Sequence, residues 1–308
     1  MPDVDVSIVT WNSAPELRAL LESLQAQTLQ PASITIVDNA STDSTQAVCA
    51  NFSNMTVLPQ ATNVGFAAGH NLGIAHGRAE FVLVVNPDVI LSPTYLEQVL
   101  SVAEALPKAA AFTGVLRRAD GRVDTTGVRV QVSRIVRDRL DVPVLPQSRF
   151  GISGAAAFYR RAALQDVAVG GQFFAETFFA YKEDVQLAWR LQWAGWGAYC
   201  VPAAVATHQR NLAAGTRRSA RDAQRRFFSY RNHLLLYPSA ESFSTVLPDL
   251  WAIVPTEIAR LLFLLVTDFR VTLRALAAAG KMWHAARTFA AQQRRSVPSA
   301  QVRKALFA

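Results

Sequence analysis

The sequence predicts an α/β protein in which a mostly parallel, doubly wound sheet is followed by a C-terminal helical extension. Two observations predict this fold: strand-like and helix-like apolar patterns alternate over about the first 210 residues, and only helix-like patterns follow. The chain has 308 residues, 51% of them hydrophobic, so it can bury a sizeable core. We expect one α/β domain over residues 1–210 and a helical, basic, amphipathic region over residues 211–308.

The first predicted unit is a strand, a helix and a second strand. Residues 4–9 alternate between apolar and polar side chains, as a half-buried strand does. Residues 13–16, Ser-Ala-Pro-Glu, have the pattern of a capping box with proline in the first helical turn, so a helix is expected to begin there. Leucines at positions 17, 20, 21 and 24 form the stripe of a helix packed on a sheet, and the apolar residues 34–37 complete a βαβ unit.

The alternation then continues along the chain. We expect a strand, a helix, a strand and a helix in turn, near residues 55–58, 66–75, 81–85 and 93–106. Residues 116–150 are polar, arginine-rich and interrupted by prolines, so they are expected to form an insertion or mobile connection outside the core. A further βα-like block spans residues 154–208.

The C-terminal region is basic as well as helical. From residue 209 onward there are 16 Lys and Arg against 5 Asp and Glu, a net charge of +11, whereas residues 1–208 carry 15 against 18, a net −3. The cations alternate with Leu, Phe and Trp, which favours an anionic membrane surface over nucleic acid, so no nucleic-acid partner is expected. Packing on the α/β domain, a homo-oligomer contact and a merely solvated basic face remain as alternatives.

The composition indicates a cytoplasmic protein, soluble or peripheral at the inner face of the cell membrane. Cys49 and Cys200 lie in apolar stretches without metal-ligand spacing, as expected of buried thiols in a reducing compartment. The first five residues carry acids instead of the cationic start of a secretory signal. The longest uncharged apolar run, residues 261–267, is shorter than the roughly 20 residues of a membrane-spanning helix.

Polar residues follow several predicted strands, where ligands bind in sheets of this kind. They are Thr10 and Asn12, Asp38 and Asn39, and Asn86 and Asp88. The first strand is followed by Thr-Trp-Asn-Ser and not by GxGxxG, and GxxxxGK[ST] does not occur in the sequence. These two observations disfavour a dinucleotide oxidoreductase and a P-loop nucleotidase.

Each of the two strand-end aspartates has two interpretations. Asp38 could accept hydrogen bonds from a nucleotide base or ribose, or it could stabilise a local turn over residues 41–43. Asp88 ends a very apolar strand, where a carboxylate suits a hard cation that bridges diphosphate oxygens, or it could cap a turn.

Two further segments carry candidate site residues. Asn63, Gly65 and Asn71 surround a predicted helix start at which the backbone could approach a sugar nucleotide closely. Glu183 and Asp184 begin another predicted helix, whose N-terminus stabilises a carboxylate in the ionised state that a general base needs. Helix capping alone is the alternative for this acidic pair.

Taken together, these segments resemble the inverting glycosyltransferases of family 2, which share the GT-A nucleotide-diphospho-sugar transferase fold, and most of all the bacterial rhamnosyltransferases. The resemblance covers the first two thirds of the chain. It is carried by VSIVTWN (6–12), ITIVDNASTDST (34–45), NVGFAAGHNLGIAHG (63–77), LVVNPDV (83–89), GAAAFYRR (154–161) and YKEDVQLAWRLQWAGW (181–196).

The resemblance implies a role for each matching residue. Asp38 would bind the donor base or ribose, Asp88 would bind Mg²⁺ or Mn²⁺, Asp184 would be the catalytic base, and His208 would complete the metal site. Asn86 stands in place of the first acid of the usual DxD triplet, so metal binding would depend more on Asp88.

Two more positions enter through the resemblance. Gln186 stands where many relatives have an acid, which weakens any assignment of acceptor contacts. Arg217 and Arg218 resemble the loop that follows the catalytic segment in the family, and they could clamp the leaving diphosphate.

The expected reaction is a single displacement. A sugar, L-rhamnose from dTDP-L-rhamnose in the first place, would pass with inversion to a glycan or polyprenyl-linked acceptor in cell-envelope polysaccharide synthesis. Donors based on UDP, with galactofuranose, N-acetylglucosamine or glucose, are one alternative. A non-catalytic scaffold that binds sugar nucleotides is the other, and the joint presence of Asp38, Asp88, Asp184 and His208 argues against it.

Overall fold

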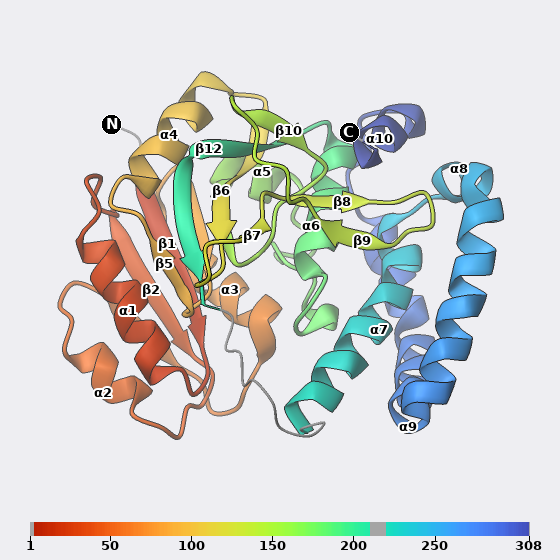
Figure 1. The fold of residues 1–308 in the computed structure, drawn as a ribbon, viewed down its shortest axis with the longest axis horizontal. Helices are drawn as coiled ribbons and strands as arrows, with labels where there is room; N and C mark the ends of the chain where they lie inside the picture. The colour runs from red at the N-terminus through yellow and green to blue at the C-terminus, as the bar shows by residue number, and fades with distance from the viewer. Residues whose placement is uncertain (1–2, 210–219, 308) are drawn as a thin grey trace.

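The computed structural model describes residues 3–209 and 220–307, and its centre is a ten-stranded mixed sheet (Figure 1). The strand order along the main path is β10-β12-β6-β11-β4-β1-β2-β3. The first four strands pair in parallel, and their bounds are β1 (Val4–Thr10), β2 (Ser33–Asp38), β3 (Thr56–Pro59) and β4 (Phe81–Val85). The predicted α/β class with a helical extension is therefore correct, although antiparallel strands enter the sheet after β4.

The helices of the first half cover both faces of the sheet. Leucines 17, 20, 21 and 24 of α1 pack with α4 against one face, and α3, α5 and α6 pack against the other. The bounds of these helices and of α2 are α1 (Ala14–Gln25), α2 (Thr45–Ala50), α3 (Gly65–His76), α4 (Tyr95–Ala105), α5 (Arg161–Asp166) and α6 (Glu183–Ala194). Alternation along β4 serves both layers, because Leu83 and Val85 face α1 and α4 while Val82 and Val84 face the other layer.

Helix α1 begins where the sequence predicted, but the capping box does not form. The hydroxyl of Ser13 donates to the backbone carbonyl of Trp11 and makes no cap. The carboxylate of Asp43 instead accepts a hydrogen bond from the backbone N–H of Ala14 at 3.2 Å. A residue from the loop after β2 thus caps α1, which ties two loops together at the carboxyl ends of β1 and β2.

The interpretation of residues 116–150 as a connection outside the core was wrong. This segment forms strands that join the sheet or make a hairpin: the end of β6 (Ala109–Arg117), then β7 (Val123–Thr125), β8 (Val128–Val130), β9 (Val136–Asp138) and β10 (Gln147–Arg149). The β8–β9 hairpin carries Arg134, which is buried and forms ion pairs with Glu241 at 2.5 Å and Asp249 at 3.0 Å. The hairpin therefore connects the sheet to the C-terminal helices.

The last strands return the chain to the middle of the sheet. Strand β11 (Ala156–Arg160) is antiparallel to both β4 and β6, and β12 (Gly197–His208) is parallel to β6. The short β5 (Val89–Leu91) pairs with the end of β12, where His208 lies opposite Val89. This pairing brings the two ends of the 88–208 segment to one place.

The C-terminal helices pack on the α/β domain. They are α7 (Ala220–Ala240), α8 (Phe243–Val246), α9 (Leu250–Ala291) and α10 (Ser299–Leu306). Leu235 of α7 and Ala279 of α9 belong to one buried cluster with Trp189 and Trp193 of α6. The indole N–H of Trp193 donates to the carbonyl of Ala240 at 2.8 Å.

Helix α9 changes the expectation about membrane segments. It is kinked at Asp268, which has non-helical backbone angles. Residues 243–291 contain one helix that is long and apolar enough to cross a membrane by length and composition, and only 6% of its most apolar 18-residue window is buried. The expectation from the sequence depended on the uncharged run of residues 261–267, which ends at Arg260 and Asp268, whereas α9 extends past both charges.

Candidate functional site

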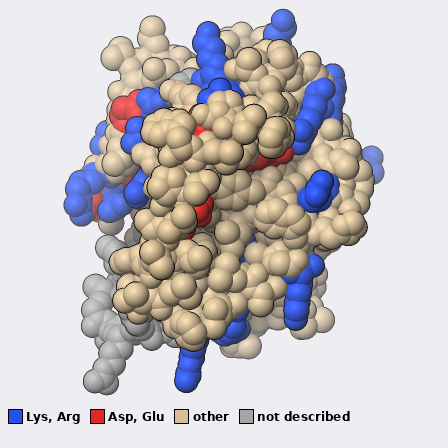
Figure 2. All heavy atoms as spheres, turned by 90° about the vertical axis from the view of Figure 1, so that its right-hand side faces the viewer, with Lys and Arg blue, Asp and Glu red and all other residues tan. Residues whose placement is uncertain are grey.

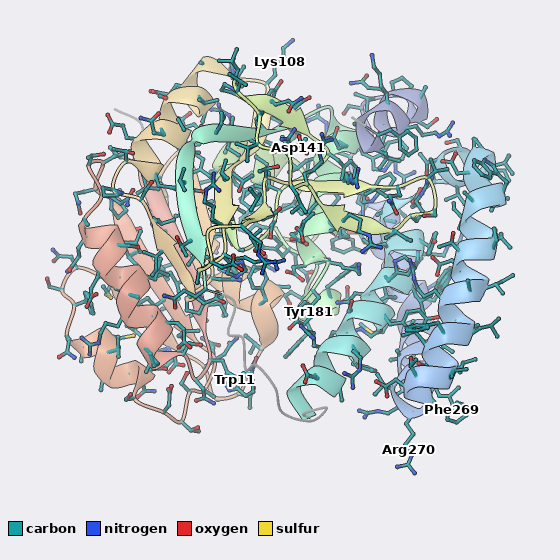
Figure 3. The ribbon with its side chains drawn as sticks, viewed as in Figure 1. Trp11, Lys108, Asp141, Tyr181, Phe269 and Arg270 are labelled. Carbon is teal, nitrogen blue, oxygen red and sulfur yellow. The ribbon has the colours of Figure 1, made fainter. Side chains whose placement is uncertain are left out.

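Three adjoining pockets lie beside α7, and Tyr181 and Arg225 line all three. We name them the strand-end pocket (about 290 Å³, with Thr10, Asn39 and Phe228), the central pocket (about 500 Å³, with Asn86, Asp184 and His208) and the basic pocket (about 530 Å³, with Arg226 and Arg260). Figure 3 shows Tyr181 and Trp11 on the α7-facing side of the α/β domain.

The segment that precedes α6 adopts an unusual backbone conformation. Phe179, Tyr181 and Lys182 have φ values of 62°, 71° and 68°, a region that residues other than glycine seldom adopt. Helix α7 fixes this turn, because the amide of Asn232 donates to the carbonyls of Phe178, Ala180 and Tyr181 at 2.6–2.8 Å. Strain of this kind persists where surrounding contacts over-determine it, and it is concentrated at functional sites.

The central pocket contains the carboxylate of Asp184, in the first turn of α6. One oxygen accepts a hydrogen bond from the backbone N–H of Gly154 at 2.9 Å, and the other accepts from the N–H of Val185 at 2.7 Å. Burial raises the pKa of Asp184, while these two hydrogen bonds lower it. The side chain is thus fixed in orientation and lines the pocket.

The neighbouring Glu183 also lines the central pocket but is held differently. It is buried, and one of its carboxylate oxygens has no hydrogen-bond partner in the described part of the chain. Burial and the adjacent charge of Asp184 raise the pKa of Glu183 well above its usual range. Of the two acids, Asp184 therefore has the better support for an ionised, oriented carboxylate.

Asp88 and His208 meet at the edge of the central pocket, as the resemblance implied. The His208 Nε2 lies 3.3 Å from a carboxylate oxygen of Asp88, and Nδ1 lies 2.9 Å from Asp124. Arg118 in turn forms an ion pair with Asp124 at 3.0 Å. Burial lowers the pKa of His208, but the hydrogen bonds and charges of Asp124 and Asp88 outweigh it and raise the value to about 9.

This arrangement suits a hard divalent cation. A carboxylate behind the imidazole is the usual support of a metal-binding histidine, because it fixes the tautomer and ring orientation. Among the described residues no group of three or more His, Cys, Asp or Glu side chains could hold a metal. Asp88 and His208 would therefore need substrate phosphates and water to complete the coordination, which is how Mg²⁺ is commonly bound.

Asp124 is a site residue that the sequence analysis missed. It lies in β7, inside the segment interpreted as a mobile connection, and it is 84 residues from His208 in sequence. Strand β7 has only three residues, and a strand this short has no apolar pattern that could reveal it in the sequence.

The strand-end pocket offers unsatisfied polar atoms next to aromatic rings. The Thr10 hydroxyl and the side-chain amide oxygen of Asn39 are buried without a hydrogen-bond partner among the described residues. Buried polar atoms are normally paired, so these two are available to a ligand. Phe66, Phe179 and Phe228 line the same pocket, and the last two rings stack at 4.9 Å.

Gly65 and Asn63 also line the strand-end pocket, and their positions are structurally required. Gly65 has a φ of 87°, and a Cβ added there would lie 2.6 Å from the carbonyl oxygen of Phe179. The Asn63 side chain accepts a hydrogen bond from the Gly65 N–H at 2.9 Å. Both residues shape the pocket wall.

The remaining predicted donor residues have local partners. Asp38 accepts hydrogen bonds from the Ser41 N–H and the Gln46 amide, both at 3.1 Å, so the turn interpretation describes this structure. Asn12 accepts from the N–H groups of Thr42 at 2.7 Å and Asp43 at 3.3 Å. These contacts fix the loop after β2.

Asn71, Asn86 and the two arginines complete the set. Asn71 is engaged with the backbone of Phe173 and Phe174 and does not line any of the three pockets, so the geometry gives no support to a donor contact there. Asn86 lines the central pocket. Arg217 and Arg218 lie outside the described residues.

Comparisons with known proteins bear on the family of this chain. Residues 5–168 match the family described as glycosyl transferase family 2. The chain is 32% identical over 248 residues to N-acetylglucosaminyl-diphospho-decaprenol L-rhamnosyltransferase of Mycobacterium tuberculosis, which covers 70% of this chain and 79% of that protein. It is 26% identical over 212 residues to the O-antigen chain rhamnosyltransferase WbaN of Salmonella anatum, which covers 67% of this chain and 66% of that protein.

A solved structure supports the fold. The mannosyltransferase PcManGT from Pyrobaculum calidifontis, in complex with GDP-Man and Mn²⁺, superposes with a TM-score of 0.58 at 20% identity and covers 98% of this chain and 87% of that one. At this identity the likeness concerns the fold alone, and it confirms the predicted GT-A architecture. The matched segment exceeds half of the chain, and the resemblance to bacterial rhamnosyltransferases is confirmed: this chain belongs to glycosyltransferase family 2.

Proposed function

We propose that this glycosyltransferase is metal-dependent and inverting, and that it transfers L-rhamnose from dTDP-L-rhamnose to a glycan or polyprenyl-linked acceptor in cell-envelope polysaccharide synthesis. The names of the two rhamnosyltransferase relatives support the sugar and the acceptor class. The single observation that carries the proposal is the oriented carboxylate of Asp184, which shares the central pocket with Asn86 and His208.

The proposed chemistry is one displacement. Asp184 takes the proton from an acceptor hydroxyl, and that oxygen bonds to the anomeric carbon while the bond from this carbon to the donor phosphate oxygen breaks. The nucleoside diphosphate leaves from the opposite side, so the configuration at the anomeric carbon inverts. Asp88 and His208, supported by Asp124, would hold Mg²⁺ or Mn²⁺, which when bound supplies neutralisation of the diphosphate charge.

The strand-end pocket is proposed to take the nucleoside of the donor. Its aromatic walls suit a base, and the free polar atoms of Thr10 and Asn39 suit base or ribose groups. Asp38 and Asn12 would act through the loop they fix, and Asn86 would face the sugar diphosphate. Arg217 and Arg218 would clamp the leaving diphosphate.

The C-terminal helices are proposed to place the enzyme at the inner face of the cell membrane. Trp251, Ile258, Leu262 and Phe269 are exposed on α9, whereas Ile253 on the same helix is buried. Figure 2 looks onto this side of the molecule and shows a broad, mainly uncharged surface with most Lys and Arg toward its periphery. A homo-oligomer contact is the alternative use of this surface.

The test of the donor is thermal stabilisation by dTDP, UDP and GDP, each with Mg²⁺ or Mn²⁺. A ligand at 100 times its dissociation constant stabilises the folded state by about 2.7 kcal/mol, so the preferred base gives the largest shift. If UDP alone stabilised the protein, the proposed donor would be a UDP-sugar and not dTDP-L-rhamnose. Slow hydrolysis of the preferred donor separates an enzyme from a non-catalytic scaffold, which would bind without turnover.

A further inference from the structure

The basic pocket has no role in the chemistry described so far. It lies beyond the Tyr181–Lys182 turn, between the start of β9, helix α7 and helix α9. Tyr181, Lys182 and Arg225 line both this pocket and the central pocket, so the two adjoin. A molecule held in the basic pocket could therefore extend to Asp184.

The charge of this pocket is one-sided. Four cationic side chains line it, Lys182, Arg225, Arg226 and Arg260, and none of its lining residues within the described ranges is acidic. Within residues 3–209 and 220–307 the Lys182 ammonium forms no ion pair or hydrogen bond, and Asp184 and Glu257 act on its charge from a distance. This cation lies two residues before Asp184 and faces both pockets.

The three arginines have carboxylate partners outside the lining. Arg226 pairs with Asp268 at 2.5 Å and Arg260 with Glu257 at 2.7 Å, while Arg225 lies 3.5 Å from Asp222. A guanidinium has five N–H donors, so one carboxylate contact orients it and leaves donors for a second anion. The guanidinium N–H groups that remain can donate hydrogen bonds to the oxygens of two phosphate groups.

The part of the wall that α9 contributes beyond Arg260 is apolar. Phe263 and Leu264 of α9 line it, and Phe263 is 65% exposed, so it lies at the rim. From this rim α9 continues with further exposed apolar side chains, including Leu262 and Val266. Figure 3 shows Phe269 and Arg270 at the kink inside this helix, far from the sheet. Charge inside and apolar surface outside match an anionic head joined to a hydrocarbon chain.

We propose that the basic pocket binds the diphosphate of a polyprenyl-linked acceptor, with the lipid leaving over Phe263 along α9 and the acceptor sugar passing Tyr181 to reach Asp184. This assignment rests on the proposed function, since it supplies the acceptor side of the same reaction. It also gives the exposed face of α9 one occupant, the membrane from which the lipid-linked acceptor comes.

The donor diphosphate is a poor occupant for this pocket. None of its lining residues belongs to the ends of β1, β2 or β4, and neither Asp88 nor His208 lines it. In an in-line displacement the acceptor oxygen and the leaving diphosphate lie on opposite sides of the anomeric carbon. That requirement calls for an acceptor site distinct from the donor site, and the basic pocket contains neither Thr10 nor Asn39.

The test is binding of farnesyl diphosphate to the full chain, measured by calorimetry in detergent, which requires neither donor nor turnover. Ser229 lines the pocket and takes part in no ion pair. The substitution Ser229→Glu therefore places a negative charge next to the negative diphosphate and breaks no existing ion pair. We expect its dissociation constant for farnesyl diphosphate to rise at least about tenfold. Arg260→Gln should weaken binding similarly, and Arg270→Gln, an exposed arginine outside the pocket, should leave it unchanged.

Several results would overturn the proposal. The first is an affinity for farnesyl diphosphate that is the same in the wild type and in folded Ser229→Glu and Arg260→Gln. The second is farnesol, which lacks phosphate, binding as tightly as farnesyl diphosphate. Competition between farnesyl diphosphate and the preferred nucleoside diphosphate would assign the ligand to the donor site. If Ser229→Glu reduced binding to phosphatidylglycerol vesicles as strongly without the prenyl ligand, the pocket would bind lipid headgroups. If the wild-type protein bound no nucleoside diphosphate, that result would contradict the proposed function and not the assignment of this pocket.

Discussion

Replacing Asp184 by asparagine tests the proposed base with the smallest structural change. The carboxylate accepts one hydrogen bond from Gly154 and one from Val185. The asparagine oxygen can keep only one of these, because the amide nitrogen then faces a second N–H donor. The lost hydrogen bond destabilises the fold, whereas removal of a carboxylate whose pKa burial raises stabilises it. We expect the two effects to offset, with Tm within about 5 °C of wild type.

Transfer should respond far more strongly than stability. A positioned general base contributes roughly 100- to 10,000-fold to rate, which is about 2.7–5.4 kcal/mol of transition-state free energy. We expect kcat to fall by at least about 100-fold in Asp184→Asn, with the dissociation constant of the nucleoside diphosphate nearly unchanged, because the base acts in the transition state. The assay is sugar transfer to the acceptor, with calorimetry for nucleotide binding.

The control is Asp120→Asn, which removes an exposed carboxylate on the turn before β7 and should transfer at the wild-type rate. Transfer by Asp184→Asn within tenfold of wild type would refute the assignment of the base. The pH profile gives a second readout. Because the base must be ionised and burial raises its pKa, kcat/KM should fall on acidification at a pH above the ordinary aspartate value of 3.8.

Three further predictions concern the metal, the turn before α6 and the membrane. Asp88→Ala should weaken Mn²⁺-dependent nucleotide binding, and Asp124→Asn should weaken it by roughly 10- to 100-fold in metal affinity; unchanged calorimetric titrations would mean that the metal binds elsewhere. Asn232→Ala removes three hydrogen bonds to the strained turn, so kcat should fall while Asp88-dependent metal binding persists, and an unaltered kcat would show that the turn holds without it. Trp251→Glu with Val266→Glu should abolish flotation with anionic liposomes at low salt; a protein that never floats would refute the membrane proposal.

Deletion of the C-terminal helices would be a poor test of the membrane proposal. Deleting residues 244–308 would remove Ala279 and Val302 from the cluster that contains Trp189 and Trp193. The truncated chain would expose that cluster, so loss of flotation could follow from misfolding. Substitution of exposed side chains on α9 avoids this, because it leaves the buried face in place.

The sequence predicted the polar residues at the strand ends well, because they follow apolar strands that are easy to recognise. Leu83 and Val85 are buried in β4, and Asp88 comes directly after, so the position of the carboxylate follows from the strand. Asp184 was predictable for a similar reason, since α6 has a clear beginning and ends at Gly195 with a left-handed backbone. Local patterns of this kind are visible in one sequence.

The contacts that complete the site are long-range, and no local pattern reveals them. Arg134 meets Glu241 across 107 residues, and His208 meets Asp124 across 84. The carbonyl of Tyr181, next to the left-handed Lys182, accepts a hydrogen bond from Asn232, which lies on another helix. These features depend on tertiary packing, and a segment rich in arginine looks solvated until its partners are known.

The proposed active site extends across the boundary that the sequence suggests near residue 210. Arg225 of α7 lines all three pockets, Phe228 closes the strand-end pocket, and Ser229 faces the basic pocket. Asn232, one turn further along, fixes the backbone that leads into Asp184. Because one face of α7 shapes the site while Leu235 on the same helix packs into the cluster with α6, movement of the C-terminal helices would alter the proposed donor, base and acceptor sites together. Attachment of α9 to a membrane would therefore fix the basic pocket relative to the bilayer surface, so that a lipid-linked acceptor could reach Asp184 without leaving the membrane.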